Sequence, residues 1–254
     1  MTIVVKLGGR VQSDPRLAGA IGALWDSAPG SLCIVHGGGD EVSALQRQLG
    51  REPVFIGGRR VTTLEDVDLV RMVLSGRANK RLVSMLSAAG VPAAGISGED
   101  GGLLPAEVID AENFGRAGRP LDPDTSIIDT LLKAGWLPVI SPVGTDVTSP
   151  AKDALNINGD DAAAAIAGAI AGQLWMIADV AGVLDHEGGL VAQIDQNETE
   201  ALVSSGVVTS GMRAKLEAGF SALAAGASVV RITSIEAFEN DRAGTFLSLT
   251  PSLR

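Results

Sequence analysis

Short apolar runs recur along the chain, and several of them end in glycine. The first run, Ile3–Val5, ends at Lys6 and leads into Leu7-Gly8-Gly9, and a second run, Ser31–Val35, ends in His36-Gly37-Gly38-Gly39. Runs of this length, rich in Val, Ile and Leu, are typical of strands buried in a parallel sheet. The same pattern predicts further strands at Pro92–Ile96, Leu137–Ile140, Trp175–Ala178, Ser228–Ile232 and Thr245–Leu249.

Stretches between these runs carry the pattern of helices. The predicted helices are Pro15–Trp25, Glu41–Leu49, Leu64–Leu74, Arg77–Ala89, Ser126–Ala134, Ala162–Ala171 and one that begins near Arg213. We expect the third and fourth to be separate helices, broken at Gly76. Val54–Ile56 and Arg60–Thr62, joined through Gly57-Gly58-Arg59, predict a hairpin, and Leu103–Asp122 predicts short hairpin strands.

The length of 254 residues suits one large α/β domain or two lobes that share a sheet. Hydrophobic residues make up 46% of the chain and aromatic residues 3%, which indicates a core of aliphatic side chains covered by helices. The polar, proline-containing stretch Thr145–Ala151 predicts a boundary between an N-terminal lobe, residues 1–150, and a C-terminal lobe, residues 151–254. The single cysteine, Cys33, excludes an internal disulfide and is expected to be a small core residue.

The formal net charge of −10 argues against a surface for nucleic acid or anionic membrane, because both need a basic footprint. An anionic substrate would therefore be met by local cations. No apolar run approaches membrane-spanning length, and the start of the chain lacks the pattern of a signal peptide. We expect a soluble, cytoplasmic protein.

Lys6 and the glycines after the first two strands form the most informative pattern. Only five lysines occur in the chain, and this one stands where a buried strand opens into a glycine turn, beside bare N–H donors. Gly37-Gly38-Gly39 precedes a predicted helix, so its N–H groups offer an anion site at a helix N-terminus. Each stretch could also be an ordinary turn that needs glycine. The phosphate motifs G-x-x-x-x-G-K-[ST] and G-x-G-x-x-G do not occur in the sequence.

Other chemistry is excluded or left open by the sequence. The two histidines and the cysteine have no metal-site spacing, G-x-S-x-G is absent, and His36 is interpreted as structural. Arg59 and Arg60 would point to opposite faces of a strand, so at most one is expected to serve a site, and both could be solvated.

Charged residues at two predicted helix starts allow more than one interpretation. We expect one of Asp160 and Asp161 to cap the helix that follows them. Lys215 is predicted in the first turn of its helix, where a cation is unfavourable. Its side chain therefore either reaches solvent or is compensated by an anion.

Six segments together resemble the amino acid kinase family, and most closely its members that act on N-acetyl-L-glutamate. They are Lys6-Leu7-Gly8-Gly9, His36-Gly37-Gly38-Gly39, Gly58-Arg59-Arg60-Val61-Thr62, Asn156-Ile157-Asn158-Gly159-Asp160, Asp179-Val180-Ala181-Gly182-Val183 and Gly211-Met212-Arg213-Ala214-Lys215. The resemblance covers essentially the whole chain. It implies a three-layer αβα sandwich around a mainly parallel open sheet, with the acyl-amino-acid site in the N-terminal lobe and ATP on the C-terminal lobe. It also implies that ATP phosphorylates the γ-carboxylate of N-acetyl-L-glutamate, a step of arginine biosynthesis.

The resemblance implies a role for individual residues. Lys6 and Lys215 are expected to neutralise the transferring phosphoryl group and Asp160 to position both lysines. Phosphoryl and substrate oxygens would be bound by the backbone of Gly8, Gly9, Gly38 and Gly39, the substrate α-carboxylate by Arg60 and its other end by Asn156. The expected nucleotide contacts are Asp179, Val180, Ala181, Gly182, Val183, Leu184, Val207, Val208 and Thr209. Magnesium would be carried on the ATP phosphates, with no metal site of the protein's own.

Several alternatives remain at this stage. The substrate could be aminoadipate linked to an acidic carrier protein, but docking such a carrier favours a basic rim, and this chain is acidic. N-succinylglutamate is a further alternative substrate, and a preference for it would differ only in residues that line the pocket. A catalytically silent binding protein on the same fold is the alternative from another class, and the missing G-x-G-x-x-G argues against a dinucleotide oxidoreductase. Because the first strand starts at Thr2 or Ile3, with no preceding helix of the kind that arginine-inhibited hexamers carry, we expect a homodimer.

Overall fold

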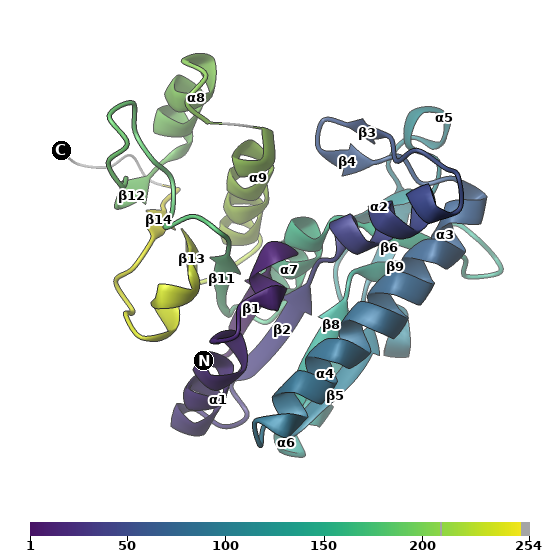
Figure 1. The fold of residues 1–254 in the computed structure, drawn as a ribbon, viewed down its shortest axis with the longest axis horizontal. Helices are drawn as coiled ribbons and strands as arrows, with labels where there is room; N and C mark the ends of the chain where they lie inside the picture. The colour runs from purple at the N-terminus through teal and green to yellow at the C-terminus, as the bar shows by residue number, and fades with distance from the viewer. Residues whose placement is uncertain (209, 250–254) are drawn as a thin grey trace.

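A computed structural model describes residues 1–208 and 210–249, and in this part of the chain eight strands form one sheet (Figure 1). In spatial order the strands are β12 (Gln193–Ile194), β14 (Thr245–Leu247), β13 (Val229–Thr233), β11 (Gln173–Ile177), β1 (Ile3–Leu7), β2 (Leu32–His36), β8 (Leu137–Ser141) and β5 (Ala93–Ser97). Neighbouring strands are parallel except for the pair β13 and β14. The predicted mainly parallel sheet is confirmed.

Helices cover both faces of this sheet. The described helices are α1 (Leu17–Ser27), α2 (Gly39–Gln48), α3 (Leu64–Arg71), α4 (Asn79–Ala88), α5 (Ala111–Phe114), α6 (Ser126–Lys133), α7 (Gly159–Ala169), α8 (Gln196–Ser204) and α9 (Ser210–Ala224), with 3₁₀ turns at Arg10–Ser13, Asp100–Gly102 and Ile235–Phe238. α7 packs on β1, β2 and β11, and α9 packs on α7 and β13. In Figure 1, α1 and α4 lie on the opposite, front face. The result is the predicted three-layer arrangement.

The register of the central strands brings their carboxyl ends to one edge. Leu7 of β1 lies opposite His36 of β2 on one side and Ile177 of β11 on the other. The three loops that follow these strands therefore begin side by side. Because ligands of open parallel sheets bind at the carboxyl ends of the strands, this edge is where a site is expected.

Two smaller sheets lie beside the main one. β6 (Pro105–Val108), β7 (Ala117–Pro120), β9 (Val143–Asp146) and β10 (Ala154–Ile157) pair as a closed four-stranded unit. Of these, β9 and β10 were not predicted from the sequence. Residues 147–153 connect them, so the stretch expected to divide the lobes is the turn between two paired strands. The division into lobes 1–150 and 151–254 itself stays a prediction.

The third sheet is a short hairpin, β3 (Phe55–Ile56) with β4 (Arg59–Arg60). Its two turn residues, Gly57 and Gly58, have φ angles of 56° and 80°. Two successive positive φ angles suit the twist of a tight hairpin and are readily adopted by glycine. The hairpin was predicted, with strands two residues shorter in total than expected.

The helix that was expected to break at Gly76 does not break there. α3 continues into a π-helix, η2 (Met72–Ala78), which continues directly into α4. Its wider turn takes up extra residues without ending the helix, and such segments occur frequently at functional sites. Gly76 is tolerated inside it. The prediction of two separate helices was therefore wrong.

The core has the predicted aliphatic content, and Cys33 is buried in β2, where burial raises the pKa of its thiol to about 12. One large cation also lies inside: Arg231 of β13 is 1% exposed, with its guanidinium 3.7 Å from the ring centroid of Trp175. Nη1 of Arg231 donates to the carbonyl of Asp241 at 2.8 Å. Among the described residues, no helix is both long and apolar enough to cross a membrane.

Candidate active site

A buried carboxylate joins two lysines at the carboxyl edge of the sheet. Lys6 stands near the end of β1, Asp160 in the first turn of α7 and Lys215 in α9. Nζ of Lys6 lies 2.7 Å from Oδ1 of Asp160, and Nζ of Lys215 donates to Oδ2 at 3.0 Å. The side chains of Lys6 and Asp160 are each 8% exposed and that of Lys215 is 20% exposed. The anion that compensates Lys215 is therefore Asp160.

This cluster has more positive than negative charge. Burial by itself raises the pKa of Asp160, but Lys6 and Lys215 outweigh that effect, so the pKa lies below its usual value and the group is ionised at neutral pH. Burial lowers the pKa of Lys6, and Lys215 adds to the effect, against the attraction of Asp160. A carboxylate shared by two ammonium groups leaves one positive charge without a partner in the cluster. Such a place favours an anionic ligand.

The structure corrects the expected place of Lys215 along its helix. α9 begins at Ser210, so Lys215 lies in its second turn and not in the first. The expectation that Asp160 or Asp161 caps α7 was also wrong. Asn158 is the N-cap, and its Oδ1 accepts a hydrogen bond from the amide of Asp160 at 2.8 Å. Because an earlier asparagine makes the cap, both aspartates are free for other contacts.

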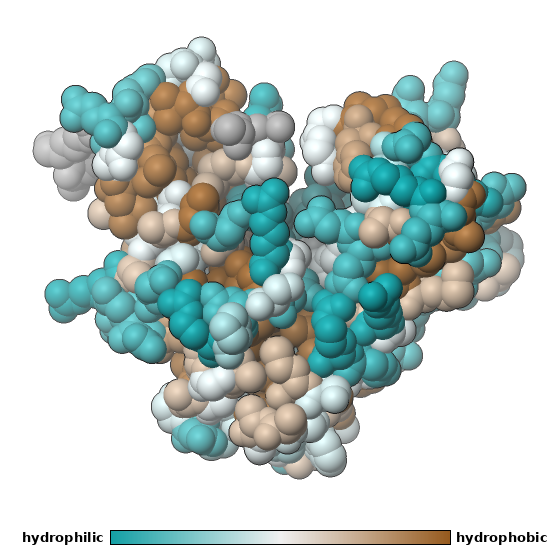
Figure 2. All heavy atoms as spheres, viewed as in Figure 1, coloured by the Kyte–Doolittle hydropathy of each residue, from teal (hydrophilic) through white to brown (hydrophobic). Residues whose placement is uncertain are grey.

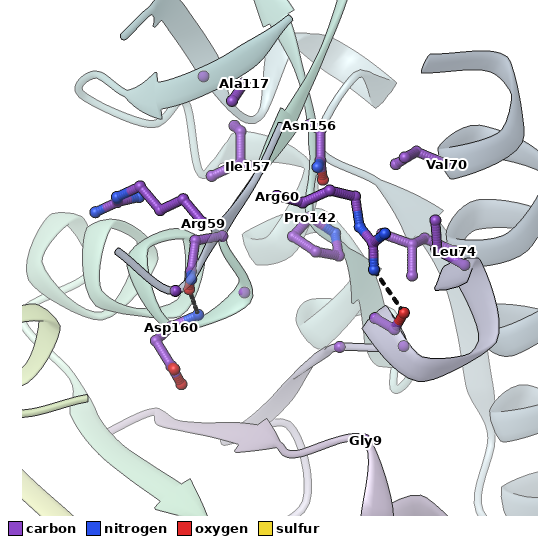
Figure 3. A pocket seen from close by; sticks show the side chains of 18 of the residues that line it. Gly9, Arg59, Arg60, Val70, Leu74, Ala117, Pro142, Asn156, Ile157 and Asp160 are labelled. Atoms are coloured by element: carbon purple, nitrogen blue, oxygen red, sulfur yellow. Dashed lines mark hydrogen bonds between the residues drawn. The ribbon is translucent and has the colours of Figure 1, made fainter. Parts of the chain in front are cut away.

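A cavity of about 220 Å³ opens beside the cluster (Figure 3). Its lining includes the predicted residues Lys6, Gly9, Gly38, Gly39, Arg60, Asn156 and Asp160, and it also includes Phe55, Gly58 and Arg59 of the hairpin. In the described part of the chain, no acceptor pairs with the amides of Gly9, Gly38 or Gly39. These N–H groups remain available to a ligand. Those of Gly38 and Gly39 lie at the N-terminus of a helix, where backbone N–H groups commonly bind anions.

Gly8 does not match its predicted role as a backbone donor. Its amide donates to the carbonyl of Ile177 at 3.0 Å, because the ladder between β1 and β11 extends one residue past the strand. A Cβ atom at Gly8 would lie 3.2 Å from that carbonyl oxygen. Gly8 lets the two backbones approach, and Gly9 is the glycine of this turn that lines the cavity.

Gly38 is needed for close packing rather than for the turn alone. It precedes α2 as its N-cap residue. A Cβ atom there would lie 2.8 Å from Cδ2 of Leu74 and 3.6 Å from Cβ of Ala78. Both neighbours belong to the π-helix, so a side chain at this position would require the end of the Leu74 side chain to move.

Arg60 is fixed to α2 by three residues along the helix. Its Nη2 donates to the carbonyl of Gly39 and to Oγ of Ser43, each at 2.7 Å, and its Nη1 donates to Oε1 of Gln46. The guanidinium also lies 4.6 Å from the ring centroid of Phe55. Burial lowers its pKa, but an arginine stays charged at neutral pH. A rigid cation is thus held against the cavity.

Arg59 was expected to point away if Arg60 served a site. In Figure 3 the two side chains do extend in opposite directions, yet both residues line the cavity. Arg59 forms an ion pair with Asp161 of α7. Sequence reasoning missed this contact because the partners are far apart in the chain.

Asn156 and the proposed structural histidine also have defined partners. Nδ2 of Asn156 donates to Oγ1 of Thr62 at 2.8 Å, which leaves its carbonyl oxygen for a ligand. His36 is fully buried, with Nδ1 2.8 Å from the carbonyl of Gly37 and Nε2 3.2 Å from Nδ2 of Asn79. Burial lowers its pKa to about 4, so it is neutral at physiological pH. An Asn79 amide at Nε2 and a carbonyl at Nδ1 require the proton on Nδ1.

The predicted nucleotide contacts lie outside this cavity. Asp179–Leu184 follow β11, where the carboxylate of Asp179 pairs with Nη1 of Arg10 at 2.8 Å. The amide of Val183 donates to Oγ1 of Thr245 at 2.8 Å, whereas Val180 and Leu184 are exposed. Val207 and Val208 lie shortly before α9 in the chain. Thr209 lies outside the described residues. The described residues contain no group of three or more His, Cys, Asp or Glu that could hold a metal ion.

Comparison with known proteins agrees with this architecture. The chain matches the amino acid kinase family over residues 1–234. It is 42% identical over 236 residues to an acetylglutamate kinase of Geobacillus stearothermophilus, covering 92% of this chain and 90% of that one.

Solved structures show the same fold. The structure of smu.665 from Streptococcus mutans superimposes with a TM-score of 0.85 at 28% identity, covering 98% and 99% of the two chains. The carbamate kinase of Giardia lamblia bound to AMP-PNP has a TM-score of 0.69 at 18% identity, with 98% of each chain covered, and at that identity it shows the fold alone. On the family match and the identity to its relatives, the chain belongs to the amino acid kinase family.

Proposed function

We propose that this protein uses ATP to phosphorylate the γ-carboxylate of N-acetyl-L-glutamate, giving an acyl phosphate for arginine biosynthesis in the cytoplasm. The relatives named acetylglutamate kinase support the substrate. The observation that carries the proposal is the Lys6–Asp160–Lys215 cluster beside a cavity that also presents Arg60. A surplus of positive charge stands where two anions would meet.

In this proposal Arg60 and Asn156 hold the acyl amino acid. The guanidinium of Arg60 would pair with the α-carboxylate, whose two oxygens would replace Ser43 and Gln46 as acceptors of its planar fork. The free carbonyl oxygen of Asn156 would accept a hydrogen bond from the amide N–H of the substrate. The amides of Gly38 and Gly39 would donate to oxygens at the reacting end.

Lys6 and Lys215 would neutralise the charge on the transferring phosphoryl group. Phosphoryl transfer between two anions needs chiefly alignment and preorganised positive charge, and a carboxylate nucleophile needs no general base. Asp160 would fix both ammonium groups in one geometry, and the amide of Gly9 would add a donor. His36, neutral and fully engaged, would shape the glycine turn without exchanging a proton with substrate.

ATP would lie along Asp179–Leu184 and the start of α9, next to Lys215. Membership of the amino acid kinase family supports ATP as the phosphoryl donor. Magnesium would reach the site on the nucleotide phosphates and screen their charge. Asp160 is occupied by two lysines, so its contacts fit a positioning role rather than a metal ligand.

The test is a substrate comparison with purified protein. N-acetyl-L-glutamate, N-succinyl-L-glutamate and unmodified glutamate are each supplied with ATP and magnesium, and acyl phosphate is trapped with hydroxylamine while ADP is measured in parallel. We expect hydroxamate and ADP in equal amounts, and the highest kcat/KM with N-acetyl-L-glutamate. A preference for the succinyl compound would change the substrate, and binding without turnover of any of the three would support the silent binding protein instead.

A further inference from the structure

The β3–β4 hairpin forms one wall of the cavity but has few supports of its own. Each strand is two residues long, and an isolated two-stranded hairpin is marginally stable in water. Its outer residues Val54, Phe55 and Ile56 are exposed, and Figure 2 shows this hydrophobic surface beside the notch between the two upper parts of the molecule. Backbone hydrogen bonds of Thr62 with Phe114 and Arg116 fix the base of the hairpin, so the position of its tip depends on what its polar side chains contact.

Two adjacent arginines attach the hairpin to opposite sides of the cavity. Arg60 binds α2, through Gly39, Ser43 and Gln46. Arg59, the first residue after the glycine turn, binds Asp161 in the first turn of α7. Alternation along the strand makes this possible, because successive side chains leave on opposite faces. Among the ion pairs of the described residues, the one formed by Arg59 is the only one that attaches the hairpin to α7.

The pair also separates the cavity from a larger space. Arg59 lines the cavity of about 220 Å³ and also an adjoining groove of about 780 Å³, and Asp161 lines that groove. The side chains are partly buried, at 35% exposed for Arg59 and 19% for Asp161. Removing the pair would let the hairpin tip leave α7 and would open the cavity toward the groove.

We propose that Arg59 and Asp161 are positioning residues, whose ion pair holds the hairpin closed over the acyl-amino-acid site and fixes it to the helix that carries Asp160. This inference rests on the proposed function for the identity of the substrate. Asp161 directly follows Asp160, so one helix turn holds both the lysine cluster and the closed hairpin. Binding of the acyl amino acid under the hairpin would thus also help to hold the lysine cluster in place, because both contacts are made by the first turn of α7.

The expected effect follows from the population of the closed hairpin. If a variant keeps the site closed about one tenth of the time, the apparent dissociation constant for the acyl amino acid rises about tenfold. Arg59→Gln and Asp161→Asn should each raise the KM for N-acetyl-L-glutamate about tenfold, with the KM for ATP within twofold of wild type. The KM of the double variant for N-acetyl-L-glutamate should be no higher than that of the more affected single variant, because both substitutions remove the same contact.

The matched control is Arg119→Gln, which removes an exposed arginine that pairs with Glu107 on β6. It should leave both KM values unchanged. Independently of activity, hydrogen exchange of the ligand-free protein should become faster at the amides of residues 54–61 in Arg59→Gln and Asp161→Asn, and not in Arg119→Gln. The reversed pair, Arg59→Asp with Asp161→Arg, should recover part of the slow exchange.

Two results would overturn the inference: unchanged hydrogen exchange of the hairpin in the single variants, or a rise in KM in the double variant equal to the product of the two single rises. If wild-type protein turns over none of the acyl glutamates, the proposed function fails, while the exchange experiment still decides whether the ion pair holds the hairpin. If Asp161→Asn does not fold, Arg59→Gln decides alone, since Arg59 lies beside the hairpin turn, partly exposed, and not in the core.

Discussion

Replacing Asp160 by asparagine should affect both stability and catalysis, because among the described residues Asp160 is the one anion that pairs with the buried Lys6 and the partly buried Lys215. Asparagine keeps the size and the helix position of the side chain but not its charge. Lys6, 8% exposed on its side chain, would then face Lys215 without a counter-ion. Breaking a buried ion pair by removing one partner costs about 3 to 5 kcal/mol.

That cost can be measured as a melting temperature. For a chain of this size, 1 kcal/mol shifts the midpoint by about 2 to 4 °C, so Asp160→Asn should melt roughly 10 °C lower than wild type. Phosphate or ATP should raise the melting temperature of the variant more than that of wild type, because removing the carboxylate adds one net positive charge to the cluster. Asp129→Asn, an exposed aspartate in α6, serves as the control and should melt within about 1 °C of wild type.

Turnover should fall as well, since neither lysine would be held toward the phosphoryl group. Loss of one preorganised contact costs about 10²- to 10³-fold in kcat, and Asp160 aligns two. The assay is steady-state kinetics at pH 7.5, with circular dichroism to show that the variant is folded. A folded Asp160→Asn with near-normal kcat and an unchanged melting temperature would refute the assignment of the cluster as the reaction centre.

Three further variants test other parts of the site. Lys215→Ala should lower kcat by about 10²- to 10³-fold with little change in the KM for ATP, and near-normal turnover in steady-state kinetics would favour a merely structural lysine. Arg60→Lys should raise the KM for N-acetyl-L-glutamate far more than that for ATP, because an ammonium group cannot form the planar fork, and equal changes in both would remove Arg60 from the substrate site. His36 has a pKa near 4 in the fold and an ordinary value near 6.5 in the unfolded chain, so the unfolded chain binds more protons between these values and stability is lost as pH falls through that window. Urea unfolding at pH 7 and pH 4 should show a loss about 3 kcal/mol larger in wild type than in His36→Gln, whereas equal losses would contradict the shifted pKa.

The sequence predicted those parts of the fold that depend on local pattern. Buried strands that end in glycine, such as the one before Gly8 and Gly9, are recognisable because strand, turn and ligand-facing backbone follow one another within a few residues. Contacts that depend on distance in space were not predictable from residue types alone. Arg59 and Asp161 lie on separate elements, and nothing in either local sequence indicates the other.

Errors arose where two local signals competed. Near the start of α7 four polar residues could each cap the helix, and the choice of Asn158 depends on the exact turn at which the chain leaves β10. Gly8 and Gly9 are identical in sequence, yet the ladder with β11 uses the amide of the first and leaves the second free. At Gly76 an ordinary helix breaker lies, exposed, within a continuous helix because the buried Val73, Leu74 and Ala78 on either side of it hold the helix in place.

The π-helix at Met72–Ala78 holds an extra residue between α3 and α4 without changing the direction in which α4 continues. A residue inserted into an ordinary α-helix would rotate everything after it by about 100°, but the wider turn absorbs that rotation. Loss of one residue there would therefore restore an α-helix and leave Asn79 beside Nε2 of His36. The change would fall on the π turn itself, where Leu74 and Ala78 lie beside Gly38, so single-residue length variation among related chains should alter the fit of the glycine turn and leave α4 in place.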